Sequence, residues 1–370
     1  MKIVVTHVPA GAGHQRASEA LVSAFHQLHF PGEVKLFSAL EGMDPWYRWC
    51  FTRGYLYLIH RAPSLWGALY HLTDCKPIFR FIQAAHRRNN ASHGKELEEI
   101  FLRIQPEILL GTHFFPMEVA SSLKARGKLS SRLFTVITDY IPHALWVAPH
   151  IDGYFVGSQA AREYLMERGV RAQQIEVTGV PIDQKFSTRE DRTTLGRKLG
   201  IDPGRFTILI GSGGSGTGPV VQLVQRLGRK DVPTQLIVVA GNNTTLFQSL
   251  ELLRPRLKIP VKNYGFIHHM DELMDVSDLM ISKAGGLTCA EALAKNLPLI
   301  LAHSIPGQES RNARLLERWG CAIRTNHLDL IPSLVEDLRK NPKKLHEMSQ
   351  KAKALASPAA ALEIAKKVSL

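Results

Sequence analysis

Cysteine is scarce in this 370-residue sequence, and the few cysteines are far apart. Cys50, Cys75, Cys289 and Cys321 form no Cys-x-x-Cys pair. This spacing indicates neither a zinc site nor a disulfide framework, so we expect a reducing, cytosolic environment. No uncharged apolar run reaches the roughly 18–20 residues that would span a bilayer. The first residues pass straight into a β-like run, so we also expect no signal peptide.

Acidic residues are outnumbered, with 33 Asp and Glu against 46 Lys and Arg and a formal net charge of +13. Such an excess of positive charge implies attraction to a polyanion, either nucleic acid or an anionic lipid surface. The sequence is 45% hydrophobic and 21% charged, a balance typical of a globular chain and not of a disordered one. Its length is enough for two domains of ordinary size.

Twelve short apolar or β-branched runs alternate with segments of helical periodicity. This alternation predicts βαβ units, parallel sheets and the α/β class. Six runs precede the Gly-Val-Pro turn at Gly179–Phe186 and six follow it, so the turn is the expected joint between two halves. We expect two doubly wound sheets facing across a cleft, with ligands at the carboxyl ends of their strands. The predicted domains are 1–178 and 179–355, followed by a C-terminal helix at 356–370.

The turn after the first strand, VPAGAGHQRASEAL, lacks the third glycine of a dinucleotide-binding fingerprint, because Arg16 occupies that position. Gly11 and Gly13 still allow a tight turn with the backbone close to a ligand. The amides of the helix that starts near His14 favour negative charge. The turn is therefore either a binding loop or a plain glycine turn with a surface histidine.

Two glycine-rich turns in the second half predict anion sites. In ILIGSGGSGTG, Ile208–Gly218, a strand runs into a Gly/Ser turn whose amides can face phosphate oxygens. It is not a Walker loop, because the Gly-Lys-Ser/Thr ending is absent. In SKAGGLTCAEAL, the first amides of a helix form a second anion site, and Lys283 either offsets the charge of the anion or is simply solvated. Glu291, one turn into that helix, either accepts the hydroxyls of a ribose or simply answers the helix macrodipole.

Residues 44–88 interrupt the strand and helix alternation. This insertion holds three of the five tryptophans, four of the eight tyrosines and seven Lys or Arg residues. Aromatic and basic side chains interleaved on helical pieces favour a bilayer interface. A helical hairpin packed on the sheet and a stacking surface for single-stranded nucleic acid are the alternatives. The membrane or acceptor candidates are Trp46, Tyr47, Trp49, Arg53, Tyr55, Trp66 and Trp146.

Taken in order, these motifs resemble the glycosyltransferase family that includes the lipid-linked N-acetylglucosaminyltransferase of peptidoglycan synthesis. They are more similar still to the monogalactosyl- and processive diacylglycerol glycosyltransferases. The resemblance covers nearly the whole chain and rests on GAGHQRASEAL, TDYIPHALWVAPHIDGYFVGS, GSGGSG, GNN, GF, SKAGGLTCAEAL and PGQESRN. It implies the GT-B architecture, with two Rossmann-like domains, the nucleotide sugar held mainly by the second domain, and the last helix packed on the first.

The resemblance also implies roles for individual residues. Gly265, Phe266 and Ile267 match the segment that reads the uracil, and Glu291 matches the ribose ligand. Gln308 and Glu309 match positions near the donor sugar. The remaining nucleotide-sugar candidates, mostly diphosphate contacts, are Gly13, Ser212, Gly213, Gly214, Ser215, Gly216, Lys283, Gly285, Gly286, Leu287 and Thr288. Family members need no metal at the diphosphate, and this sequence has no Asp-x-Asp motif, so we expect no metal and no cofactor.

Inverting transfer requires a base that takes the proton of the acceptor hydroxyl while the UDP leaving group gains charge. Histidine suits this role at neutral pH, and His14 matches the family's histidine. We predict His14 as the base or as the residue that orients it. Asp139 and His143, in TDYIPHALW, are the reserve candidates.

The leading hypothesis is transfer of a hexose from UDP-glucose or UDP-galactose to 1,2-diacylglycerol. The enzyme would dock as a peripheral, monotopic protein on the anionic cytoplasmic face of a membrane and would bind no nucleic acid. The enzyme alternatives are N-acetylglucosaminyl transfer to a polyprenyl-linked acceptor and epimerisation of a UDP-sugar at C2. A basic module that binds lipid or nucleic acid is the non-enzyme alternative.

Overall fold

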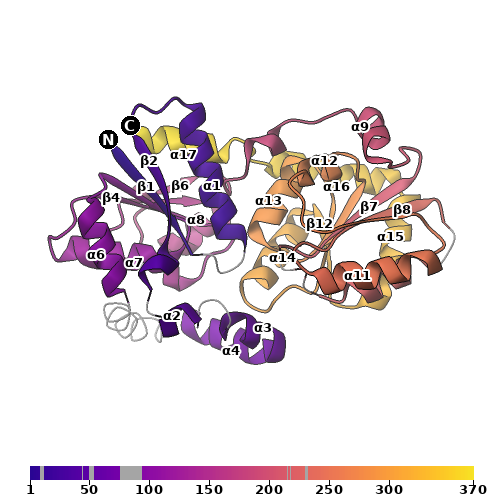
Figure 1. Ribbon diagram of the computed structural model, residues 1–370, viewed down its shortest axis with the longest axis horizontal. Coiled ribbons are helices and arrows are strands. Elements are labelled where there is room, and N and C mark those ends of the chain that lie inside the picture. The colour runs from indigo at the N-terminus through magenta and orange to yellow at the C-terminus, as the bar shows by residue number, and fades with distance from the viewer. Residues whose placement is uncertain are drawn as a thin grey trace. The chain divides into compact units, whose positions relative to one another are not determined.

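The computed structural model describes residues 1–8, 12–43, 45–49, 54–75, 94–214, 216, 218–229 and 232–370. The predicted site residues Arg53 and Ser215 lie outside the described residues, as do the side chains of Tyr47 and Tyr55. The chain divides into two compact units (Figure 1). Unit 1 comprises Met1–Gln184, Ile305–Arg311 and Ser357–Leu370, and unit 2 comprises Lys185–Ser304 and Asn312–Ala356.

This division corrects the predicted boundaries in two places. The first boundary falls after Gln184 instead of residue 178, and the short segment Ile305–Arg311 belongs to unit 1 although it lies within the predicted second domain. The segment joins unit 1 because Gly307 packs on the ring of Tyr70 and Arg311 pairs with Asp74. Sequence periodicity carries no signal for such a contact.

Unit 1 contains a six-stranded parallel sheet with the strand order β2-β1-β3-β4-β5-β6. The strands are β1 (Lys2–His7), β2 (Glu33–Ser38), β3 (Ile108–Gly111), β4 (Arg132–Val136), β5 (Gly153–Val156) and β6 (Ile175–Val177). The longer helices of the unit are α1 (Ala12–Gln27), α4 (Pro63–Asp74), α6 (Lys95–Ile104), α7 (Phe114–Ala125), α8 (Gln159–Met166) and α17 (Ala360–Ser369). The shorter ones are η1 (Ala39–Gly42), α2 (Pro45–Trp49), α3 (Tyr55–Arg61), η3 (Ala144–Trp146) and η4 (Ala172–Gln174). η5 (Gln184–Ser187) begins at Gln184 of unit 1 and continues into unit 2.

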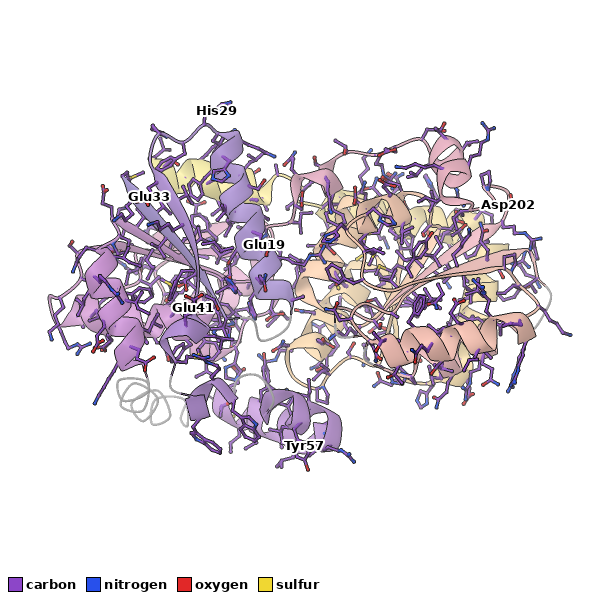
Figure 2. All side chains as sticks on the ribbon, in the orientation of Figure 1. Glu19, His29, Glu33, Glu41, Tyr57 and Asp202 are labelled. Carbon is purple, nitrogen blue, oxygen red and sulfur yellow. The ribbon has the colours of Figure 1, made fainter. Side chains whose placement is uncertain are left out.

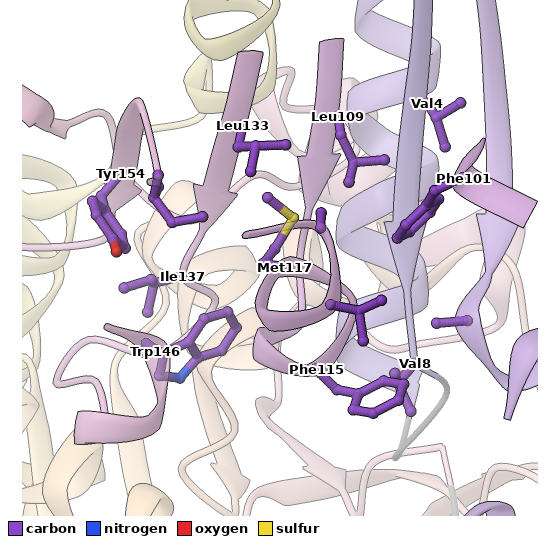
Figure 3. Close-up of a cluster of buried hydrophobic side chains, with 14 of the residues drawn as sticks. Val4, Val8, Phe101, Leu109, Phe115, Met117, Leu133, Ile137, Trp146 and Tyr154 are labelled. Atoms are coloured by element: carbon purple, nitrogen blue, oxygen red, sulfur yellow. The ribbon is translucent and has the colours of Figure 1, made fainter. Parts of the chain in front are cut away.

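Successive residues of the inner strands enter different cores, because side chains alternate across a sheet. Val4 of β1 belongs to the cluster drawn in Figure 3, with Leu109, Leu133, Tyr154 and Trp146. Its neighbours Ile3 and Val5 belong to a second cluster. Strands covered on both faces need apolar residues at every position, which is why they read as continuous hydrophobic runs.

The last helix belongs to unit 1. α17 packs beside α1 (Figure 1), and its Ile364 and Val368 are fully buried with Phe25 of α1. Each such aliphatic side chain contributes about 1.5–3 kcal/mol by burial. The segment just before α17 packs against Gly179. The φ of Gly179 is +95°, and a Cβ atom on this residue would lie 2.3 Å from Cβ of Ser357. Only glycine fits there.

Unit 2 contains a second six-stranded parallel sheet, with the order β12-β11-β10-β7-β8-β9. Its strands are β7 (Phe206–Gly211), β8 (Thr234–Val239), β9 (Val261–Tyr264), β10 (Leu279–Ser282), β11 (Leu299–Ala302) and β12 (Ala322–Thr325). Its helices are α9 (Arg192–Leu199), α10 (Val220–Leu227), α11 (Thr244–Leu253), η6 (Arg254–Arg256), α12 (Met270–Asp275), α13 (Gly286–Ala294), η7 (Leu328–Leu330), α15 (Ile331–Lys340) and α16 (Pro342–Leu355). α14 (Gln308–Trp319) begins in the segment that unit 1 contains. Two parallel sheets, built from the twelve predicted runs, confirm the α/β prediction.

Each sheet has one point where the chain reverses its direction of travel across the strands. In unit 1 it lies between β1 and β3, and in unit 2 between β7 and β10. Loops that leave the carboxyl ends of such neighbouring strands diverge and leave a crevice for a ligand. Among the described residues, no helix is long and apolar enough to cross a membrane.

Candidate active site

His14 lies at the reversal point of unit 1. It follows β1 in the first turn of α1, while Thr112 directly follows β3, and the pairing of Thr6 with Gly111 brings the two loops together. Nδ1 of His14 lies 2.6 Å from the carbonyl oxygen of Thr112 and 3.2 Å from Oγ1 of Thr138. The hydroxyl of Thr112 in turn donates to the carbonyl oxygen of His14 over 2.9 Å. The histidine is therefore held at both its ring and its backbone.

These contacts determine which nitrogen of the His14 ring carries the proton. A carbonyl oxygen can only accept a hydrogen bond, so Nδ1 of His14 carries the hydrogen and Nε2 is the unprotonated atom. Burial lowers the pKa of His14 from 6.5 to about 4, and the contact with Thr112 only partly opposes the shift. The ring is neutral at pH 7 and presents Nε2 as a proton acceptor.

Aromatic rings surround this histidine. The ring of His113 meets it edge-on with centroids 5.0 Å apart, and the indole of Trp146 lies 6.1 Å away. Nδ1 of His113 accepts from the amide of Phe115 over 3.2 Å and so caps α7. Burial holds the pKa of His113 well below its usual value. The two rings that face His14 are thus uncharged at neutral pH.

The two reserve candidates occupy different surroundings. Asp139 is partly buried in the loop after β4, next to Thr138, which contacts His14. His143 is buried away from that contact: Nδ1 accepts from the amide of Leu145 over 3.1 Å, and Nε2 donates to the carbonyl oxygen of Tyr70 over 3.0 Å. Both nitrogens of His143 are engaged inside unit 1, and burial lowers its pKa to about 4.

Trp146, a membrane or acceptor candidate, is a buried residue of unit 1. Its side chain is 5% exposed and lies in the core cluster of unit 1 with Ile137 and Phe115 (Figure 3). Trp146 is the last residue of η3, and its ring faces the core and His14 instead of a surface. Trp146 belongs to the wall of the candidate active site.

In unit 2, the glycine turn after β7 adopts a conformation that requires glycine. Gly213 and Gly216 have φ values of +70° and +59°, and a Cβ atom on Gly216 would lie 2.3 Å from the carbonyl oxygen of Ala240. The carbonyl oxygens of Gly214 and Gly216 accept from Asn242 and Asn243 over 3.0 and 2.9 Å. These bonds hold the loop by its carbonyl oxygens, and the amide of Gly216 itself donates to the carbonyl oxygen of Gly213 over 3.1 Å.

The second predicted anion site starts beside the first. Ser282, the last residue of β10, pairs with Gly211, the last of β7, so their loops leave the sheet as neighbours. A Cβ atom on Gly213 would lie 3.1 Å from Cε of Lys283, which places this lysine against the glycine turn. α13 then begins at Gly286 with Gly285 at its N-cap. The predicted diphosphate residues of both loops are therefore brought together.

The remaining nucleotide-sugar candidates lie at three further places. Phe266 follows β9, with Gly265 and Ile267 on either side, and is 57% exposed, which is unusual for phenylalanine and suits a ring that covers a base. Glu291 is buried in α13. Gln308 is partly exposed, and buried Glu309 accepts from the amide of Ile305 over 2.9 Å. Both of these residues belong to the segment Ile305–Arg311 of unit 1.

The described part of the insertion carries exposed apolar side chains on α2, α3 and α4. Trp46 and Trp49 of α2 are 64% and 45% exposed, and their rings stack at 5.3 Å. Tyr57 of α3, labelled in Figure 2, is also largely exposed. Trp66 is only partly exposed, and its ring packs against the ring of Tyr70. We call the exposed set Trp46, Trp49, Tyr57, Leu65, Leu69 and Leu72 the α2–α4 apolar surface.

Sequence reasoning missed the residues that hold His14. Thr112 is 98 positions away along the chain, and only the pairing of β1 with β3 brings it close. A signal was present, since Thr112 and His113 are polar residues that directly follow a buried strand, where site residues of parallel sheets lie.

Two six-stranded parallel α/β sheets, one in each unit, define the GT-B fold class. Solved structures agree on the fold. MurG of Acinetobacter baumannii matches with a TM-score of 0.61 at 13% identity, over 100% of this chain and 99% of that one. The UDP-GlcNAc 2-epimerase of Neisseria meningitidis, bound to UDP-GlcNAc, also gives 0.61, at 12% identity and 99% coverage of both chains.

Sequence comparison identifies the family. Residues 14–182 match monogalactosyldiacylglycerol (MGDG) synthase, and residues 207–366 match the glycosyltransferase family 28 C-terminal domain. A processive diacylglycerol beta-glucosyltransferase of Bacillus licheniformis is 36% identical over 263 residues, which cover 71% of this chain and 68% of the relative. The chain therefore belongs to the glycosyltransferase family of the monogalactosyldiacylglycerol synthases and processive diacylglycerol glucosyltransferases.

Proposed function

We propose that this hexosyltransferase moves glucose or galactose from a UDP-sugar to the free hydroxyl of 1,2-diacylglycerol, with inversion at the anomeric carbon. The observation that carries the proposal is His14, whose Nδ1–H is held by the Thr112 carbonyl so that Nε2 is left to accept a proton. The activities for which the matched family and the Bacillus licheniformis relative are named support diacylglycerol as the acceptor.

In the proposed reaction, Nε2 of His14 takes the hydroxyl proton as the acceptor oxygen attacks the anomeric carbon. The new C–O bond forms while the bond from that carbon to the β-phosphate oxygen breaks, and UDP leaves with the bonding electrons. The imidazolium that forms keeps its Nδ1–H on the Thr112 carbonyl, which orients and stabilises it. Asp139 is the second candidate for the base, and variants of the two residues separate them.

We propose further that the diphosphate is neutralised without a metal ion. The amides of the glycine turn after β7 and of the first turn of α13, with Lys283 between them, supply partial and full positive charge where the leaving group develops its own. EDTA is then expected to leave the transfer rate unchanged. A rate that falls with EDTA and returns with Mg²⁺ would contradict this.

The α2–α4 apolar surface is the proposed membrane-docking site. Its tryptophan, tyrosine and leucine side chains suit the headgroup and acyl boundary of a bilayer, and Arg48 and Arg61 are exposed on the same helices. Docking on the anionic cytoplasmic face of a membrane would bring the enzyme to its water-insoluble acceptor. The positive net charge supports the same orientation.

The test is a transfer assay with vesicles that contain diacylglycerol and an anionic lipid, and with UDP-glucose, UDP-galactose and UDP-GlcNAc each labelled in the sugar. We expect label in the lipid fraction with one or both hexoses. A labelled polyprenyl product with UDP-GlcNAc, or C2 epimerisation of UDP-GlcNAc without an acceptor, would overturn the proposal. The same panel names the sugar.

A further inference from the structure

α4 has two opposite faces. At about 100° per residue, Gly67, Tyr70 and Asp74 share one face, and the leucines at 65, 69 and 72 share the other. The first three are buried, while Leu65, Leu69 and Leu72 are 53%, 39% and 49% exposed. The exposed face is part of the α2–α4 apolar surface.

The buried face of α4 packs in register on the segment Ile305–Arg311. A Cβ atom added to Gly67 would lie 2.8 Å from Cβ of Pro306, and one added to Gly307 would lie 2.8 Å from the ring of Tyr70. One turn further, Nη2 of Arg311 lies 2.6 Å from Oδ2 of Asp74. Helix and segment therefore touch at three consecutive levels, two of them so close that only glycine fits.

Asp74 is the centre of this contact. Its Oδ1 accepts from the amide of Ala144 over 2.8 Å and from the hydroxyl of Tyr164, and a second cation, Arg168, lies 3.6 Å from Oδ2. Burial would raise the pKa of Asp74, but the hydrogen bonds from Tyr164 and Arg311 lower it, so the carboxylate stays charged. A buried charge with this many partners is costly to leave unpaired.

Arg311 completes the connection to the rest of unit 1. Its guanidinium lies 5.0 Å from the centre of the Tyr70 ring and donates to the carbonyl oxygen of Pro142 over 3.2 Å. Tyr70 in turn packs on His143 with centroids 4.5 Å apart. The loop with Asp139 and His143, the helix α4 and the segment Ile305–Arg311 thus share one ionic centre.

We propose that Asp74 is a positioning residue for transfer: through Arg311 it fixes the segment that carries Gln308 and Glu309 against the lipid-facing helix α4. The inference rests on the proposed function, because these two residues are the candidates for contact with the donor sugar. It assigns a second task to the insertion. The insertion docks the enzyme and also holds the donor-sugar segment in its working conformation.

The decisive variant is Asp74→Asn, which keeps the acceptor for the Ala144 amide but removes the charge that Arg311 needs. We expect kcat to fall at least tenfold and the KM for the UDP-hexose to rise, while the Kd for UDP and vesicle binding stay within twofold. The matched control is Asp329→Asn, in the exposed pair Arg226–Asp329 at 2.8 Å, and it should change nothing. If the kcat and the KM for the UDP-hexose of Asp74→Asn lay within twofold of those of this control, the proposal would be overturned.

A second variant and a second measurement keep the test independent of stability and of the reaction. Gly67→Ala removes no charge but pushes a methyl group against Pro306, and it should give the same kinetic pattern. Hydrogen exchange of the full chain should show at least tenfold faster exchange over 63–74 and 305–311 in Asp74→Asn. Unchanged exchange in both segments would overturn the proposal. If wild type transferred no hexose to diacylglycerol, the proposed function would fail while this exchange result still tested the contact.

Discussion

The substitution His14→Asn separates the two nitrogens of the proposed base. The Asn amide reaches roughly as far as Nδ1 of histidine, so it can still donate to the Thr112 carbonyl, but nothing replaces Nε2. The loop is expected to keep its conformation while the proton acceptor disappears. His29→Asn is the matched control, because His29 is exposed at the end of α1 with a φ of +49°, which asparagine tolerates.

The size of the effect follows from the role. A positioned general base contributes about 10²–10⁴-fold, which at about 1.4 kcal/mol per tenfold corresponds to about 3–6 kcal/mol of the barrier. The retained hydrogen bond is worth only about 0.5–1.5 kcal/mol of stability, so His14→Asn should unfold close to wild type and His14→Ala slightly earlier. Because UDP is assigned to unit 2, its affinity should not change.

The assay is steady-state transfer to diacylglycerol vesicles, with UDP affinity measured by calorimetry on the same preparations. We expect kcat to fall at least a hundredfold in His14→Asn with an unchanged Kd for UDP, and no change in His29→Asn. Since the pKa of His14 is about 4, wild-type rates should also be flat above about pH 5 and fall below it. A variant that retains a tenth of the wild-type kcat would refute His14 as the base and point to Asp139.

Three further predictions follow from other parts of the structure. Burial lowers the pKa values of His143 and His14 from 6.5 to about 4, so the unfolded chain binds these protons first, and about 3 kcal/mol of stability per histidine, present above pH 6.5, should be lost as the pH falls to 4. Urea unfolding as a function of pH measures this loss, and a flat profile would contradict it. Gly216→Ala should weaken UDP binding at least tenfold by calorimetry, because of its positive φ and the Ala240 carbonyl, whereas Gly204→Ala in an exposed turn should not; equal affinities would remove the glycine turn from the diphosphate site. Replacing Trp46 and Trp49 by serine should lower vesicle pelleting without changing UDP affinity, and undiminished pelleting would argue against the α2–α4 apolar surface.

The sheets could be predicted from sequence because buried parallel strands need apolar residues on both faces. The continuous apolar runs LLG in β3 and LIVV in β8 are typical of such buried strands. The glycine turns could be predicted for a related reason, since left-handed backbone selects glycine locally, as at Gly213 and Gly216. Both signals lie within a few neighbouring residues.

The contacts that organise the candidate site could not be predicted in this way, because they join distant parts of the chain. The pair of Asp74 and Arg311 spans 237 positions, and His14 and Thr112 are 98 apart. The burial of Trp146 beside His14 could not be predicted either, since a tryptophan occurs both at surfaces and in the walls of sites. These contacts become visible only with the strand order of the sheet and the packing of α4.

The central claim is transfer with inversion to diacylglycerol, and the anomeric configuration of the product tests it most directly. Wild-type enzyme is incubated with diacylglycerol vesicles and a UDP-α-hexose labelled with carbon-13 at C1, and the extracted lipid is examined by NMR. We expect a β-linked glycosyl diacylglycerol and an equal amount of released UDP. An α-linked lipid would contradict a single displacement assisted by a base. Label that remains in the UDP-hexose or in other water-soluble products would contradict the proposed acceptor.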